Sequence, residues 1–116
     1  MQLLIFITNQ TECINPILTD LFERKLGGAT VVDCEGMVKA LGGSDSEPPP
    51  MFGSLLLFLH TQHETGKMLF TVLEDAEVDE AKQVVRTRAG GLEQPGSGVM
   101  FTLPVTSMEG TANRHD

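Results

Sequence analysis

Residues 90–98, Gly-Gly-Leu-Glu-Gln-Pro-Gly-Ser-Gly, lead directly into residues 99–105, Val-Met-Phe-Thr-Leu-Pro-Val, and this junction decides the fold. Four glycines and one proline within nine residues argue against a helix and predict a loop with positive φ angles or close backbone approach. The apolar run that follows predicts a strand, with its odd-numbered residues on one face and its even-numbered residues on the other. Because Pro104 donates no backbone hydrogen bond, we expect this strand to end there or to lie at a sheet edge.

The composition is that of one globular domain. The chain has 116 residues, 41% of them hydrophobic, and no apolar run approaches the roughly 20 residues that span a bilayer, so we expect no membrane insertion. The net charge of -8 disfavours binding to nucleic acid or anionic lipid. Cys13 and Cys34 lack CxxC spacing, and residues 1–7 lack the basic start of a secretory signal. We therefore expect reduced thiols and a cytoplasmic location.

Three further segments predict strands. Residues 2–8 form a nearly continuous apolar run, which is typical of a central strand covered on at least one face. Residues 29–34 are rich in β-branched side chains, and residues 67–73 form a third apolar run that ends at an acidic pair. Together with the run after the glycine-rich loop, these segments predict four strands.

Two segments predict helices that pack on the core. The first has an apolar stripe at helical spacing, formed by Ile14, Ile17, Leu18, Leu21, Phe22 and Leu26. Its start is open between a cap at Asn15 and an irregular turn near Thr11, and Lys25 followed by the glycines at 27–28 is a stop signal. The second helix has its apolar positions at Val78, Ala81, Val84 and Val85.

The segments between and after these elements are less regular. Residues 36–53 are rich in Gly, Ser, Asp, Glu and Pro, which predicts a long loop that is either functional or an idle insertion. Residues 54–60 are apolar but unpatterned, so they fit a strand or a short buried helix, and we favour the helix. Residues 107–116 have no core-forming pattern and predict a flexible C-terminal tail.

The order of these elements is β-α-β, a long insertion, and β-α-β. It predicts an α+β domain over residues 1–106, namely a ferredoxin-like βαββαβ sandwich whose four-stranded antiparallel sheet has two helices on one face. The other face of the sheet then stays apolar and uncovered. Since natural proteins usually hide such a face by oligomerising, we expect self-association.

This arrangement resembles the PII (nitrogen regulatory protein P-II) signal-transduction superfamily. The resemblance rests on residues 28–31 (Gly-Ala-Thr-Val), the loop after the second strand, and residues 96–101 (Gly-Ser-Gly-Val-Met-Phe), and it covers residues 2–106. It implies a PII-like, ferredoxin-like homotrimer that senses an adenine nucleotide, often with a small metabolite, in clefts between subunits. It also implies signalling through loop 36–53, which docks onto a membrane transporter or an enzyme.

The resemblance places a ligand site between the second strand and the glycine-rich loop. The expected ligand-binding residues are Thr30, Gly36, Lys39, Gly90, Gly91, Gly96, Ser97 and Gly98. Backbone N–H groups of the glycine-rich loop can form an anion-binding nest, and Lys39 and Lys67 are candidate cations. The chain departs from the family at the end of this loop, where Val99 stands in place of a phosphate-binding lysine. The sequence leaves the ligand's identity open.

Other residues keep two alternative functions open. His60 and His63 lie at i, i+3 beside Glu64, with Cys34 elsewhere, so they could ligate a divalent ion if their segment is helical. The divalent-cation tolerance protein CutA shares the trimeric architecture, which makes a CutA-like metal-binding trimer the main alternative. A structural or adaptor trimer without a ligand is the other. Nothing in the spacing joins Cys34 or Ser97 to a histidine, so we expect no enzyme and no catalytic residue.

Overall fold

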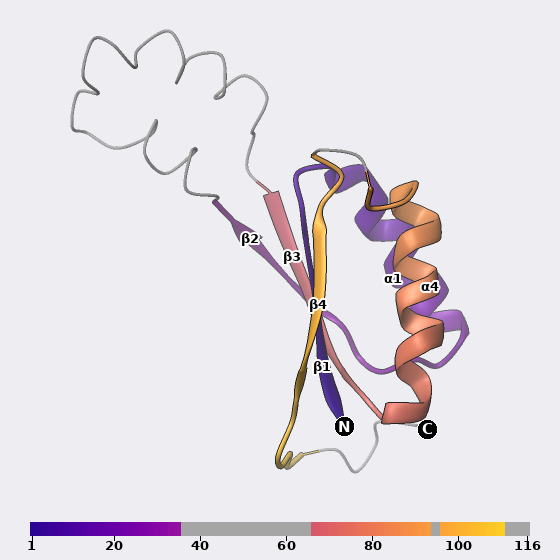
Figure 1. Ribbon diagram of the computed structural model, residues 1–116, viewed down its shortest axis with the longest axis vertical. Helices are drawn as coiled ribbons and strands as arrows, with labels where there is room; N and C mark the ends of the chain where they lie inside the picture. The colour runs from indigo at the N-terminus through magenta and orange to yellow at the C-terminus, as the bar shows by residue number, and fades with distance from the viewer. Residues whose placement is uncertain (36–65, 94–95, 111–116) are drawn as a thin grey trace, which may run out of the picture.

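The computed structural model describes residues 1–35, 66–93 and 96–110, which form a sheet with two helices on one side (Figure 1). The strands are β1 (Gln2–Thr8), β2 (Thr30–Cys34), β3 (Gly66–Leu73) and β4 (Val99–Pro104). The helices are α1 (Ile14–Glu23) and α4 (Val78–Ala89), preceded by the 3-10 turns η1 (Thr11–Cys13) and η2 (Asp75–Glu77). The four predicted strands and both predicted helices are confirmed.

The sheet has the strand order β2-β3-β1-β4, and every pair of neighbours is antiparallel. Strand β1 pairs along its length with β3 on one side and β4 on the other, which explains its nearly continuous apolar sequence. Strand β4 pairs only with β1 among the described strands and ends at Pro104, as predicted. This α+β topology is compatible with the predicted ferredoxin-like fold.

The core lies between the sheet and the helix pair. Inner-face residues alternate with outer-face residues along β1 and β3, and the inner-face positions from Leu4 to Thr8 and from Leu69 to Leu73 are buried. Helices α1 and α4 cover this face of the sheet (Figure 1). The largest apolar side chains of this core are Leu4, Phe6, Ile17, Leu69, Leu73 and Val85. Burial of these side chains provides most of the driving force for closing the two layers.

Helix α1 ends before the predicted glycine stop signal, and this corrects the sequence interpretation. Lys25, not a glycine, takes the left-handed conformation with a φ of 58°, just after the helix. The Leu26 N–H donates to the Leu21 carbonyl at 2.9 Å, and the Lys25 N–H donates to the Phe22 carbonyl at 3.1 Å. These two bonds form a Schellman motif, in which buried Leu26 packs back on the helix.

Phe22 is the residue of the predicted apolar stripe that does not reach the core. Its side chain is 83% exposed, whereas Leu21 is buried. Phe22 follows Leu21 by about 100° around the helix axis and lies one turn beyond Leu18, which is itself only partly buried. The stripe therefore ends at Leu21, and the prediction that Phe22 is a core residue was wrong.

Two ion pairs join the helices on their solvent side. The Arg88 guanidinium donates to both carboxylate oxygens of Asp20, from Nε at 2.7 Å and from Nη2 at 3.0 Å. Arg24 pairs with Glu80 at 3.1 Å. The hydrogen bond from Arg88, helped by its charge, lowers the pKa of Asp20 below its ordinary value. The pairs connect α1 to α4 and so fix the two helices to each other over the core.

The outer face of the sheet is apolar but uncovered by any described element (Figure 1). The strand register arranges its side chains in three cross-strand rows. These rows are Val32-Met68-Ile7-Val99, Thr30-Phe70-Ile5-Phe101 and Val72-Leu3-Leu103. Phe101 is 40% exposed and Leu103 is 47% exposed, so the edge strand β4 presents large apolar groups to solvent.

Several predictions fall on residues that the structure does not describe. The loop 36–53, the segment 54–60, and residues 111–116 of the predicted tail lie outside the described residues, and so do His60 and His63. Residues 105–110 are described without regular secondary structure. No helix within the described part of the chain is long and apolar enough to cross a membrane.

Candidate functional site

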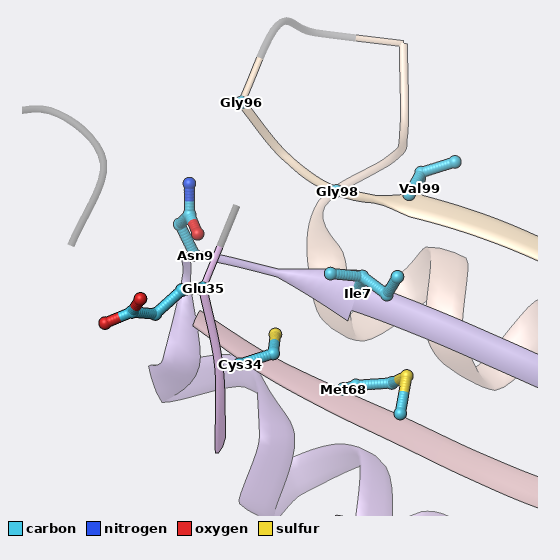
Figure 2. A pocket seen from close by; sticks show the side chains of 8 residues that line it. All are labelled: Ile7, Asn9, Cys34, Glu35, Met68, Gly96, Gly98 and Val99. Atoms are coloured by element: carbon cyan, nitrogen blue, oxygen red, sulfur yellow. The ribbon is translucent and has the colours of Figure 1, made fainter. Parts of the chain in front are cut away.

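A cavity of about 440 Å³ lies at one end of the sheet, where β1 and β2 end and where β3 and β4 begin. Figure 2 shows the eight residues that line it, drawn from all four strands and the segments that flank them. They are Ile7, Asn9, Cys34, Glu35, Met68, Gly96, Gly98 and Val99. The antiparallel order of the sheet brings these distant segments together at one edge.

The floor of the cavity is apolar and belongs to the outer face of the sheet. Ile7 pairs with Met68 on one side and with Val99 on the other, so the three side chains form one row across β3, β1 and β4. Figure 2 shows Cys34 beside Met68, and on β2 it lies two residues beyond Val32, the partner of Met68. The cavity is therefore continuous with the uncovered apolar face and offers a flat hydrophobic surface to a ligand.

The wall above this floor is the glycine-rich loop, and its shape depends on Gly98. This residue has a φ of 131°, a backbone conformation that residues other than glycine rarely adopt. A Cβ atom here would lie 2.8 Å from the Ile7 carbonyl oxygen and 2.8 Å from Cε1 of Phe6. Gly96 also has a positive φ, of 82°, but has open space around it. Only a glycine at position 98 lets the loop lie this close to β1.

A buried threonine holds the loop in place. The Thr8 hydroxyl donates to the Ser97 carbonyl oxygen at 3.0 Å and accepts a hydrogen bond from the Gln10 N–H at 2.9 Å. Thr8 is 2% exposed and Ser97 is 4% exposed, so neither of these polar groups has much access to water. The hydroxyl therefore links the end of β1 to the glycine-rich loop, and it sets the spacing of two walls of the cavity.

Glu35 is the charged residue among the described lining residues of the cavity. Exposed Glu35 lies at the outer rim, where its side chain points away from Ile7 (Figure 2). Lys67, which the sequence suggested as a cation for the ligand, bonds to Asp33 at 2.6 Å. Lys67 precedes Met68 on β3, so the pleat turns it to the opposite face of the sheet. The lining residues that the structure describes include no lysine or arginine.

The two cysteines lie in different environments. Cys34 is a half-buried free thiol on the cavity wall, and Cys13 is buried in the core. Burial and, to a lesser extent, the neighbouring Glu12 carboxylate raise the pKa of the Cys13 thiol, which favours its neutral form. Within residues 1–35, 66–93 and 96–110, no three His, Cys, Asp or Glu side chains are placed to hold a metal ion.

The structure separates the predicted ligand-binding residues into groups. Gly96 and Gly98 line the cavity, and Ser97 lies buried behind them with its carbonyl bound to Thr8. Gly36 and Lys39 lie outside the described residues. Thr30 is at the opposite end of β2 from Cys34, about 13 Å along the strand, and does not line the cavity.

Gly90 and Gly91 also lie away from the cavity lining, for a local reason. Gly90, with a φ of 74°, follows the end of α4 in the left-handed conformation, and the Gly91 N–H donates to the Arg86 carbonyl at 2.9 Å. This is the common glycine cap of a helix. Their presence in the sequence is explained by the end of α4, without reference to a ligand.

Sequence reasoning did not assign a binding role to most of the cavity lining. Ile7, Asn9 and Met68 were interpreted only as strand or turn residues, and Glu35 was not singled out. Their positions along the chain were the one indication of a shared site, because Asn9 and Glu35 follow the ends of two strands and Met68 is near the start of a third. Because register is a long-range property, their meeting could be found only once the strand order was known.

Comparison of the sequence with protein-family models gives no match, and comparison with curated proteins gives no match either. The functional interpretation therefore depends on the cavity, on the uncovered sheet face, and on the resemblance that residues 28–31 and 96–101 suggest.

Proposed function

We propose that this chain is a PII-like regulatory protein, a homotrimer that binds a small metabolite or an adenine nucleotide between its subunits. One observation carries the proposal. Gly96 and Gly98, two of the expected ligand-binding residues, lie at one cavity together with Cys34 and Glu35 at the end of β2. The cavity volume of about 440 Å³ falls in the range of roughly 300–1,000 Å³ that is typical of small-molecule pockets.

The uncovered sheet face supports the subunit contact in this proposal. The row of Met68, Ile7 and Val99 belongs both to the cavity floor and to the exposed apolar face. A second copy of the chain packed on that face would bury apolar surface and would also close one side of the cavity. Ligand binding and assembly would then stabilise each other.

The position of Glu35 suggests how a bound ligand could be signalled. Glu35 lies at the cavity rim and directly precedes residues 36–53, which the sequence predicts to be a loop. A ligand that contacts this rim can favour one conformation of the following segment, provided that it binds that conformation more tightly. We propose that this segment contacts a transporter or an enzyme in the cytoplasm.

The test combines an oligomer mass with a ligand screen. Light scattering after size-exclusion chromatography should give the mass of a trimer. Thermal unfolding should then be followed with ATP, ADP, AMP, adenosine, cyclic nucleotides, 2-oxoglutarate, bicarbonate and divalent metals. A specific ligand at 100 times its dissociation constant should add about 2.7 kcal/mol of stability. A chain that stays monomeric, or one that responds to none of these compounds, would contradict the proposal.

A pair of tryptophan variants ties any response to the cavity. Val99 is 53% exposed and lines the cavity, so Val99→Trp should fill the space without burying a large group in the core. Thr106→Trp adds the same side chain at an exposed position after β4. Only Val99→Trp should abolish the ligand-dependent thermal shift. Equal shifts in both variants would place the ligand elsewhere.

A further inference from the structure

We infer that the cavity takes a ring compound of about nucleoside size that carries no phosphate group. The inference rests on the proposed function, because it concerns the ligand of the same cavity. It is carried by three observations: the floor of the cavity is apolar, the charged residue of the described lining is Glu35 at the rim, and Lys67 pairs with Asp33 instead of lining the cavity.

The floor suits a flat ring. Met68, Ile7 and Val99 are adjacent across three strands, so they present one continuous apolar surface. A planar ring laid on this row would exclude water from both partners, and the thioether of Met68 is polarisable and contacts aromatic rings favourably. The volume of about 440 Å³ leaves room for a ring with a sugar-sized substituent.

The charges around the floor disfavour a phosphate. Glu35 is the charged residue among the described lining, and the chain has a net charge of -8. Lys67 directly precedes the lining residue Met68, but its ammonium is bound to Asp33 at 2.6 Å and lies on the inner face of the sheet, away from the cavity floor. A triphosphate would therefore bring negative charge near Glu35, with no lysine or arginine among the described lining residues to balance it.

The start of β4 reinforces this discrimination. Val99 stands directly after the glycine-rich loop, where a side chain from β4 reaches the cavity, and its apolar group is 53% exposed. An apolar group at this position can pack against a ring but cannot neutralise a phosphate. The same position is therefore the one at which a single substitution should change the ligand preference.

Isothermal titration calorimetry on the full chain provides the test. Adenosine, guanosine, cytidine and uridine should each be titrated at low ionic strength against the corresponding 5′-triphosphate. We expect the best-binding nucleoside to bind at least about tenfold more tightly than its triphosphate. Added salt should narrow this difference, since it screens the repulsion between the phosphates and Glu35.

Three variants separate the charge effect from other causes. Val99→Lys should lower the nucleoside-to-triphosphate affinity ratio by about tenfold, because it places a cation at the cavity. Thr106→Lys makes the same change in net charge at an exposed site outside the lining and should leave the ratio within about twofold. Glu35→Gln should lower the ratio by less than Val99→Lys, because it removes an anion without adding a cation.

The outcomes distinguish this inference from the proposed function. A triphosphate, or any phosphorylated compound of the wider screen, that binds more tightly than its unphosphorylated counterpart overturns the inference and leaves the proposed function in place. An equal ratio in Val99→Lys and Thr106→Lys also overturns it. If no compound of the screen binds at all, the proposed function fails, and the inference fails with it.

Discussion

The two faces of the sheet are similar in sequence but differ in environment. On the inner face, Phe6 and Leu69 are fully buried beneath α1 and α4. On the outer face, Phe101 and Leu103 are 40% and 47% exposed, although they are as apolar as their inner counterparts. Alternation in the sequence therefore assigns residues to faces, but it does not show what covers each face. The candidate cavity lies at the end of the uncovered face.

Truncation of one phenylalanine on each face should reveal the largest difference in stability between the two environments. Phe6→Ala should lower the free energy of unfolding by about 3–5 kcal/mol, because it leaves a cavity in the closed core. Phe101→Ala removes the same group from a partly exposed site, so for dilute protein it should cost less than about 2 kcal/mol. Urea unfolding monitored by circular dichroism gives both values.

The Phe101→Ala variant also tests the proposed use of the outer face. If this face joins subunits, Phe101→Ala should lower the oligomer mass measured by light scattering at a given concentration. A mass that is unchanged by Phe101→Ala, together with equal stability losses for the two variants, would mean that the two faces do not differ as described.

A second pair of variants tests whether close contact with β1 shapes the glycine-rich loop. Gly98→Ala should lower the free energy of unfolding by about 2–4 kcal/mol, because it combines a disfavoured φ with contacts of 2.8 Å to Phe6 and Ile7. Gly90→Ala has a φ of 74° but nothing within 4 Å, so it should cost only about 1 kcal/mol. Similar losses would show that crowding against β1 does not shape the loop.

Two buried threonines allow the hydrogen bond at the cavity wall to be measured by itself. Thr8→Val should cost about 1–3 kcal/mol, because it leaves the Ser97 carbonyl and the Gln10 N–H without this partner. The Thr71 hydroxyl is equally buried, but it has no hydrogen-bond partner in the described part of the chain. Thr71→Val should therefore be neutral or slightly stabilising.

The functional consequence of Thr8→Val is a further readout. If Thr8 positions the loop over the cavity, Thr8→Val should weaken binding of any ligand found in the thermal screen, whereas Thr71→Val should not. Ligand affinity that is equal in both variants would limit Thr8 to a structural role. Chemical denaturation and calorimetry on the same two proteins provide the comparison.

The sequence was sufficient for the strand and helix pattern because that pattern is local and strong. The run at residues 2–8 and the alternation from Val99 to Pro104 correspond to β1 and β4 as observed. The errors occurred where a tertiary contact decided the result. Leu26 packs back on α1 and places Lys25 in the left-handed conformation that the sequence suggested for a glycine.

The candidate site was only half predictable for the same reason. Positive φ angles at Gly96 and Gly98 follow from local composition, and the structure confirms both. The apolar floor depends on the register that places Ile7 between Met68 and Val99, and that register is difficult to infer from a single sequence because it depends on long-range pairing. Gly90 was expected to bind the ligand, but its role as the C-cap of α4 explains why a glycine stands at this position.

The helices α1 and α4 are held on the inner face by apolar packing, and the ion pairs between them could add to this stability. The Arg88 hydrogen bond lowers the pKa of Asp20 in the folded chain, so Asp20 should stabilise the fold above its unfolded pKa of about 3.9. That stabilisation should be lost as pH falls through the lower folded pKa, because protonation removes the charge that Arg88 binds.

Asp20→Asn should therefore be less stable than the natural chain at pH 7 and should approach it in stability near pH 2. We expect this to be the smallest of the effects, since the Arg88 side chain is 46% exposed and water screens the pair. Glu109→Gln, at an exposed site after β4, serves as the control and should run parallel to the natural chain. Urea unfolding between pH 2 and pH 7 measures all three proteins. A constant gap between Asp20→Asn and the natural chain at every pH would show that the Asp20–Arg88 ion pair does not help to hold the helices over the inner face.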